Sequence, residues 1–198
     1  MGTSNLNLAG LIGSRICHDL ISPIGAIGNG LELLEMRGAH DGVELDLIAR
    51  SAVQARARIA FYRLAFGHGG DDLVARREIV PLLDDLLAGG RIVCDWGPED
   101  PCPRAGVRLA FLAFMCCESA LPYGGTVRIA QEGGGWRIAG DSARLQVDPT
   151  LWSALASGRV APDIAPAHVQ FALLPEVARD QGRTLSVTWN EGSVRIGF

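Results

Sequence analysis

The chain has 198 residues, of which 48% are hydrophobic and 20% are charged, so it is long enough for one medium domain or two small ones that each bury a core. Its formal net charge of −4 argues against a broad nucleic-acid surface, because neutralising phosphates usually takes a basic patch. Every one of the 18 positively charged residues is an arginine. The absence of lysine excludes a P-loop nucleotidase and any enzyme that works through a Schiff-base lysine or a Ser–Lys pair.

The N-terminal residues lack the charged-then-apolar pattern of a signal peptide, and no run of 18 apolar residues occurs anywhere in the chain. The five cysteines form no CxxC pair and have no zinc-like spacing (Cys17, Cys94, Cys102, Cys116, Cys117). We therefore expect a soluble cytoplasmic protein, with no membrane or nucleic-acid partner and with cysteines that are mostly small core residues.

An apolar-periodic stretch over residues 6–36 predicts one long helix that displays a histidine, His18. At 100° per residue, the face of His18 also carries Leu11, Ser14, Ser22, Gly25 and Asn29. The opposite, apolar face carries Ile16, Leu20, Ile27, Leu31 and Leu34, with Ile24 at its margin. Pro23 cannot donate to the carbonyl of Asp19, so the helix should bend or loosen just after His18.

A second long helix is predicted after a capping box at residues 41–44. Its expected core stripe consists of Leu45, Ile48, Ala52, Ala55, Ile59, Tyr62 and Phe66. Its outer face carries Arg50, Arg56, Arg58 and Arg63, which either form a solvated face or help to dock an acidic partner. The two helices should form an antiparallel hairpin, and a second copy is the simplest cover for both apolar stripes, which predicts a four-helix bundle in a homodimer.

A polar, glycine-rich break at residues 67–72 predicts a domain boundary, with one domain over 1–68 and another over 69–198. Beyond the break, helices are expected over 78–87, 107–121, 149–155 and 167–181, and strands over 91–95, 125–131, 136–140, 184–189 and 193–198. Residues 97–103 should be a loop. The fold class is therefore α+β, a helical hairpin followed by an α/β sandwich with one mixed sheet and helices on a single face.

The stretch His18-Asp19-Leu20-Ile21-Ser22-Pro23 resembles the phospho-acceptor box of two-component histidine kinases, which has a histidine, an adjacent acid and a proline five residues on. The longer run CHDLISPIGAIGNGLELLE resembles more narrowly the ChpT-type histidine phosphotransferases, cytoplasmic dimers that relay phosphoryl groups between receiver domains. This resemblance implies that residues 1–68 are a dimerisation and phosphotransfer hairpin. It also implies that residues 69–198 form a degenerate domain like the kinase ATPase domain, without nucleotide binding.

The nucleotide-binding elements of the kinases are only partly retained in the second half. The stretch Pro122-Tyr123-Gly124-Gly125-Thr126-Val127 matches a kinase Pro-x-Gly-Gly-x-Val motif, but the asparagine that helps to hold Mg²⁺ corresponds to Cys116. A neutral thiol is a poor ligand for a hard metal. The adenine-contacting Asp-x-Gly-x-Gly loop corresponds to residues 141–145, where Asp141 remains and both glycines are replaced. The glycine-rich lid has no counterpart, so we expect no cofactor bound by this chain.

A neutral imidazole is a good phosphoryl acceptor near pH 7, so the resemblance implies that His18 is the phosphoacceptor. Asp19 would orient the imidazole and stabilise its positive charge, and Arg15 and Ser22 would contact the phosphoryl group or the receiver. The partners would be response-regulator receiver domains, the phosphodonor of a hybrid kinase and one or more acceptors, and they would supply the Mg²⁺. The plainer interpretation is that His18 is an ordinary exposed helix residue.

Two other functions stay open on the sequence. The first is an atypical ATP-dependent histidine kinase, which would autophosphorylate with ATP and Mg²⁺. The second is a scaffold that binds receivers without chemistry, and its binding and output would be unchanged by His18→Ala.

Overall fold

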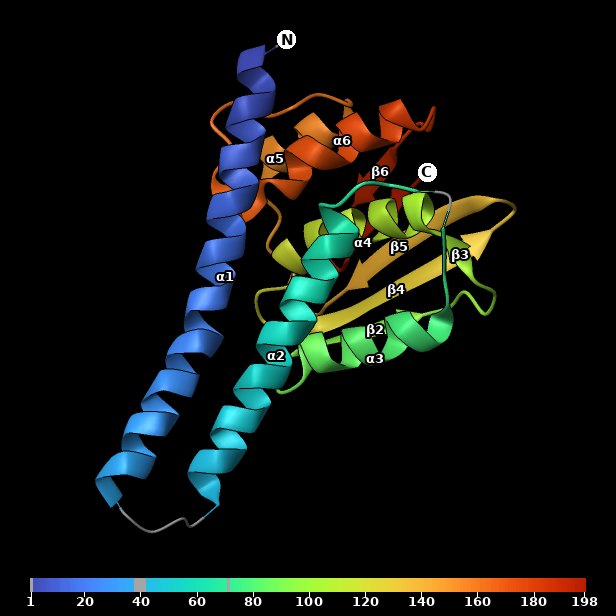
Figure 1. The fold of residues 1–198 in the computed structure, drawn as a ribbon. Helices are drawn as coiled ribbons and strands as arrows, with labels where there is room; N and C mark the ends of the chain where they lie inside the picture. The colour runs from blue at the N-terminus through green and yellow to red at the C-terminus, as the bar shows by residue number, and fades with distance from the viewer. Residues whose placement is uncertain (1, 38–41, 71) are drawn as a thin grey trace.

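Two long helices, α1 (Gly2–Arg37) and α2 (Val43–Ala65), form an antiparallel hairpin in the computed structural model, which describes residues 2–37, 42–70 and 72–198 (Figure 1). The C-terminal end of α1 and the N-terminal end of α2 project away from the rest of the molecule, and the N-terminal half of α1 lies beside the last helices of the chain. The predicted hairpin is confirmed. Asp41, the predicted capping residue, lies outside the described residues.

Helix α1 runs without interruption through Pro23, whose ring is buried. The helix therefore has no break at the proline, and the bend predicted just after His18 stays a prediction. Further along, the two helices approach closely at Gly30, where a Cβ atom would lie 2.6 Å from Cγ1 of Ile48. A glycine at this point lets the hairpin close.

One chain alone leaves part of the predicted apolar faces of the hairpin exposed. On α1, Ile24 and Leu31 are 56% and 51% exposed, and on α2, Leu45 and Ile59 are 51% and 47% exposed. The buried side of α2 near its C-terminus consists instead of Ala57, Phe61, Tyr62 and Ala65. The reason is that α2 packs against α1 on one side and against helices of the second half on the other, so a single heptad stripe cannot describe its core.

The second half contains a five-stranded sheet in the order β2-β4-β5-β7-β6. Its strands are β2 (Ile92–Trp96), β4 (Gly125–Glu132), β5 (Gly135–Asp141), β6 (Ser186–Trp189) and β7 (Ser193–Gly197). The pair β2–β4 is parallel and the other pairs are antiparallel, so the predicted mixed sheet is confirmed. Gly133 and Gly134 both have positive φ in the tight turn between β4 and β5, as this turn requires.

One face of the sheet is covered. Along β4 and β5, Ile129 and Ile138 are buried and pair with each other, whereas Arg128 and Arg137 are exposed. Helices α3 (Arg76–Leu87), α4 (Arg104–Ser119) and α5 (Pro149–Ala156) pack against the strands. The 3₁₀ turn η1 (Pro166–His168) packs against α1, and α6 (Gln170–Asp180) packs against α4 and α5. The α+β fold class with helices on a single face is therefore confirmed.

Helix α4 is the centre of the hydrophobic core, and its position follows from its sequence. Residues 109–117 are all buried, because α4 lies between α2 and the sheet and has no polar face (Figure 1). Phe61 of α2 stacks on Phe111 of α4 with ring centroids 4.6 Å apart. The core is thus continuous across the predicted boundary between residues 68 and 69, which itself stays a prediction.

The structure adds a short antiparallel pair that the sequence did not predict, β1 (Leu73–Val74) with β3 (Cys102–Pro103). Strand β3 lies in the segment predicted to be a loop. The sequence could not indicate it, because two residues are too few to show a strand periodicity. Among the described residues, no helix is both long enough and apolar enough to cross a lipid bilayer.

Candidate functional site

His18 stands on α1 with 83% of its side chain exposed, so the displayed histidine predicted from the sequence is confirmed. Its neighbours on the same face, Ser14, Ser22, Gly25 and Asn29, are also exposed. Small and polar side chains leave the approach to the imidazole open, and another protein can reach the ring without steric obstruction.

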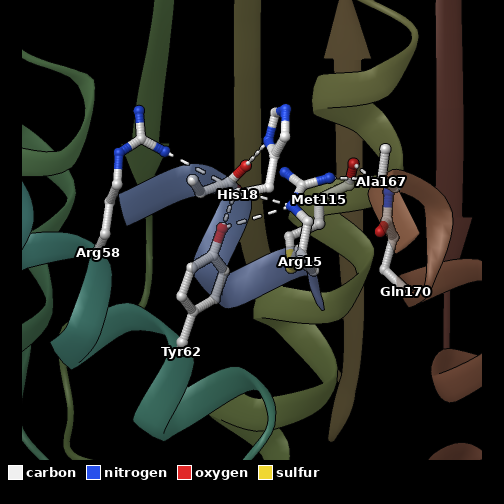
Figure 2. A network of polar contacts seen from close by, with 8 residues as sticks. Arg15, His18, Arg58, Tyr62, Met115, Ala167 and Gln170 are labelled. Carbon is white, nitrogen blue, oxygen red and sulfur yellow. Dashed lines mark hydrogen bonds and ion pairs between the residues drawn. The ribbon is translucent and has the colours of Figure 1, made fainter. Parts of the chain in front are cut away.

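The Asp19 carboxylate is the centre of a polar network beside His18. Figure 2 shows its other members, His18, Arg15, Arg58 and Tyr62. Its Oδ1 atom lies 3.0 Å from Nδ1 of His18, and its Oδ2 atom accepts a hydrogen bond of 2.7 Å from Nε of Arg15. The hydroxyl of Tyr62, which reaches across from α2, also donates to Oδ2. Nη1 of Arg58 is 4.0 Å from the same oxygen.

These contacts fix the charge on Asp19. Partial burial alone would raise the pKa of the carboxyl, but the hydrogen bonds from His18 and Tyr62 and the charge of Arg15 together lower it below its ordinary value. Burial, and then the hydrogen bond to Asp19, raise the pKa of Tyr62 to about 12. The network therefore holds an ionised aspartate and a neutral tyrosine at neutral pH.

An ionised carboxylate can only accept hydrogen bonds, so the imidazole nitrogen that faces Asp19 carries the proton. In the neutral ring this is Nδ1, and the lone pair is then on Nε2. Because the side chain is mostly exposed, Nε2 is free to meet an electrophile from solvent or from a partner. The arrangement suits a nucleophilic histidine oriented by an adjacent acid.

Arg15 joins this site to the second half of the molecule. Besides its bond to Asp19, the guanidinium donates through Nη1 to the backbone carbonyl of Ala167 in η1. Close by, Gln170 at the start of α6 donates to the carbonyl of Met115 in α4, 3.4 Å away (Figure 2). Helix α1 is thus joined to the helical layer by the Arg15–Ala167 hydrogen bond as well as by apolar packing, and α6 is joined to α4 by the bond from Gln170.

The other arginines of α2 differ from Arg58. Arg50 and Arg63 are exposed, and Arg56 lies 3.8 Å from Asp85 of α3. Arg58 alone of the four points toward the Asp19 network, with 35% of its side chain exposed.

Ser22 lies one turn beyond His18 and makes no hydrogen bond within the described part of the chain.

Tyr62 is the member of the network that the sequence pattern missed, because its position in an apolar stripe indicated a core residue. The side chain is indeed buried, at 6% exposed, and its ring stacks on Phe66 with centroids 5.1 Å apart. A buried tyrosine usually needs a hydrogen-bond partner for its hydroxyl. That requirement was the one available signal of a polar neighbour.

The two residues that the resemblance aligns with the kinase nucleotide site, Cys116 and Asp141, lie in different surroundings. Cys116 is fully buried in α4, and burial raises the pKa of its thiol well above the ordinary value. Asp141, at the end of β5, is paired with Arg128 at 2.7 Å and lies 3.7 Å from Arg195. Within residues 2–37, 42–70 and 72–198, no group of three histidine, cysteine or acidic side chains is placed to hold a metal ion.

Comparison with known proteins agrees with this picture. The chain is 38% identical over 133 residues to the protein phosphotransferase ChpT of Brucella abortus (strain 2308), a match that covers 66% of this chain and 63% of that protein. The match thus spans less than two thirds of the Brucella protein. A solved structure of a bacterial phosphotransferase superposes with a TM-score of 0.80 and 31% identity, covering 100% of this chain and 98% of the other.

The family model for the histidine phosphotransferase C-terminal domain matches residues 76–193, which is more than half of the chain. The resemblance to ChpT-type proteins predicted from the acceptor stretch is confirmed by these three similarities. The chain therefore belongs to the histidine phosphotransferase C-terminal domain family.

Proposed function

We propose that this protein is a histidine phosphotransferase of a two-component phosphorelay, which carries phosphoryl groups on His18 between aspartates of response-regulator receiver domains. The observation that carries the proposal is the exposed imidazole of His18 with its Nδ1 atom held 3.0 Å from Asp19. Membership of the family supports the reaction class.

In the proposed reaction, Nε2 of His18 attacks the phosphorus of a phosphoaspartate on the donor receiver. The N–P bond forms as the bond between phosphorus and the receiver carboxylate oxygen breaks, and the carboxylate leaves with its negative charge. Nδ1 keeps its proton, so the ring becomes positively charged opposite the Asp19 carboxylate. Transfer to an acceptor receiver is the reverse of the same step.

Alignment and charge neutralisation are most of what phosphoryl transfer requires. Arg58 is the cation best placed to meet the incoming phosphoryl group, since it lies near Asp19 without a close ion pair. Arg15 is committed to Asp19 and Ala167, and we infer that its contribution is mainly to fix Asp19.

Ser22 is exposed on the same face as His18 and would contact the receiver. The receiver would bring the Mg²⁺, and the predicted cytoplasmic location would place both partners together.

We further propose that the chain does not use ATP. The buried Cys116 thiol cannot replace a metal-binding carboxamide at the surface. The Asp141 carboxylate is already engaged by Arg128 and Arg195. Incubation with ATP and Mg²⁺ should give no autophosphorylation and no thermal shift. Either signal would favour an atypical kinase instead.

The relay step itself is tested with an isolated, phosphorylated receiver domain as donor. We expect label to move to the wild-type chain and not to His18→Ala, with receiver binding retained in both. Equal labelling of the two proteins would contradict the proposal. Receiver binding without transfer in the wild type would favour the non-catalytic scaffold.

We also propose a homodimer, in which a second copy covers the apolar residues that the hairpin leaves exposed. These residues are Ile21, Ile24, Leu31 and Met36 on α1 and Val43, Leu45 and Ile59 on α2. Apolar side chains exposed along both helices of the hairpin suit an association site, and pairing two hairpins would give the four-helix bundle predicted from the sequence.

The double variant Leu31→Glu, Leu45→Glu should therefore be monomeric, because two carboxylates per chain would be buried in the dimer at a cost of several kcal/mol. Light scattering measures the mass in solution. The matched control is Val93→Glu, a change of the same kind at a residue 63% exposed on the sheet, which should leave the mass unchanged. A wild-type monomer, or a dimeric double variant, would exclude this interface.

A further inference from the structure

The two oxygens of Asp19 have different partners, and this division determines what His18 can do. Oδ1 faces only the imidazole, whereas Oδ2 accepts from Arg15 and from the Tyr62 hydroxyl. A carboxylate held through one oxygen keeps the other oxygen in a fixed direction. The orientation of His18 thus depends on the groups that hold Oδ2.

Tyr62 is held more rigidly than either arginine near Oδ2. The residue as a whole is 6% exposed, whereas the side chains of Arg15 and Arg58 are 17% and 35% exposed. Phe66 stacks on one side of the ring, and the ring of Phe61 meets it edge-on with centroids 5.9 Å apart. Phe61 in turn stacks on Phe111 of α4. The hydroxyl therefore projects from the rigid core of the molecule toward a carboxylate on the neighbouring helix.

The two arginines attract the Asp19 carboxylate by their charge, unlike the neutral Tyr62 hydroxyl. Arg15 divides its hydrogen bonds among Asp19, the carbonyl of Ala167 and, at 3.5 Å, the Tyr62 hydroxyl. Arg58 lies 4.0 Å from Oδ2, and a small rotation of the carboxylate would bring it into a closer ion pair. Such a rotation would draw Oδ1 away from Nδ1 of His18. The Tyr62 hydroxyl is a neutral donor on α2, and its hydrogen bond to Oδ2 opposes this rotation of the carboxylate without adding a competing charge.

We propose that Tyr62 is a positioning residue for phosphotransfer, which holds Asp19 so that His18 keeps its proton on Nδ1 and presents Nε2 to the phosphoryl group. Tyr62 touches neither the imidazole nor the reacting atoms. Its hydroxyl donates to Asp19 and accepts a hydrogen bond of 3.5 Å from Nε of Arg15, and its effect on His18 passes through Asp19. The predicted effect on transfer rests on the proposed function. The predicted effect on the position of the imidazole proton does not depend on any partner protein. The raised pKa of Tyr62 agrees with this role, since the hydroxyl stays a donor throughout the physiological range.

The test is Tyr62→Phe, which removes the hydroxyl and retains the ring between Phe61 and Phe66. Single-turnover transfer from a phosphorylated receiver should slow about tenfold, the order expected when one hydrogen bond to a charged group is lost. In ¹⁵N NMR spectra of the neutral imidazole, wild-type His18 should be protonated on Nδ1, and the variant should show a mixture of both tautomers. A purely structural role for Tyr62 would not change the tautomer of an exposed histidine on another helix.

Two comparisons make the result specific. Tyr123→Phe removes the only other tyrosine hydroxyl, from a ring that is 49% exposed and stacked under Arg144, and should leave both rate and tautomer at wild-type values. In an Asp19→Asn background, Tyr62→Phe should slow transfer by less than about twofold further, because its effect passes through Asp19.

An unchanged tautomer in a folded Tyr62→Phe protein would overturn the proposal, and so would a full tenfold loss in the Asp19→Asn background. If the wild type accepts no phosphoryl group at all, the proposed function fails, and the tautomer comparison still decides the role of Tyr62. Thermal unfolding of each variant establishes that the compared proteins are folded.

Discussion

Asp19→Asn should slow phosphotransfer to His18 by about 100-fold or more, the largest effect expected from any change beside the histidine itself. The amide has no charge to stabilise the positive ring that forms as Nε2 binds phosphorus. It can also turn its NH₂ group toward Nδ1, which would favour the wrong tautomer. Tyr62 and Arg15 would lose their charged acceptor at the same time.

Single-turnover transfer from a phosphorylated receiver measures this loss. Asp46→Asn is the matched control, because Asp46 is an exposed aspartate in the first turn of α2, and its rate should stay within about twofold of the wild type. If Asp19→Asn were as fast as Asp46→Asn, the carboxylate would have no part in the chemistry.

Asp19 should also make the fold sensitive to acid. Because the pKa of its carboxyl is lower in the folded protein than in the unfolded chain, the stabilisation is present above the unfolded-state pKa and is lost as the pH falls through the folded-state pKa. In Asp19→Asn this part of the pH dependence should be absent. Urea unfolding of both proteins at neutral pH and at pH values near and below the ordinary aspartate pKa measures the difference.

Cys116→Asn, which restores the residue type of the kinases, should lower the free energy of unfolding by about 2–4 kcal/mol. Cys116 is fully buried among the apolar side chains of α4, where a carboxamide would find too few hydrogen-bond partners. For a chain of this size the loss corresponds to a midpoint lower by roughly 5–15 °C. The variant should gain no binding of ATP, because Asp141 remains paired with Arg128.

Calorimetry of Cys116→Asn beside Cys17→Asn tests this expectation. Cys17 is exposed on α1, so the same substitution there should change the melting temperature by only a degree or two. An equally stable Cys116→Asn protein, above all one stabilised by ATP and Mg²⁺, would mean that α4 still lines a nucleotide site.

The elements of this fold could be predicted where their signal is local. The hydrophobic period over 6–36 matches α1, and the glycines between residues 132 and 135 mark the turn that joins β4 to β5. The apolar run near 107–121 predicts a buried helix, and α4 is buried along its length. Each of these patterns depends on neighbours within one or two turns of the chain.

What the sequence missed depends on contacts between distant segments. Nothing near Tyr62 indicates that its hydroxyl meets Asp19, 43 residues away. The packing of α2 against both α1 and α4 decides which of its apolar residues are buried, so Phe61 is in the core and Ile59 is exposed. Arg58 could be chosen from four arginines on α2 only when the position of α1 was known.

The most direct test of the account is a relay in three parts, with a phosphorylated donor receiver, this chain and an unphosphorylated acceptor receiver. We expect label to leave the donor, pass through an acid-labile, base-stable phosphohistidine at His18 and reach the acceptor without ATP. With His18→Ala the acceptor should stay unlabelled. Labelling of the acceptor at the same rate with His18→Ala, or with the chain left out, would contradict the account.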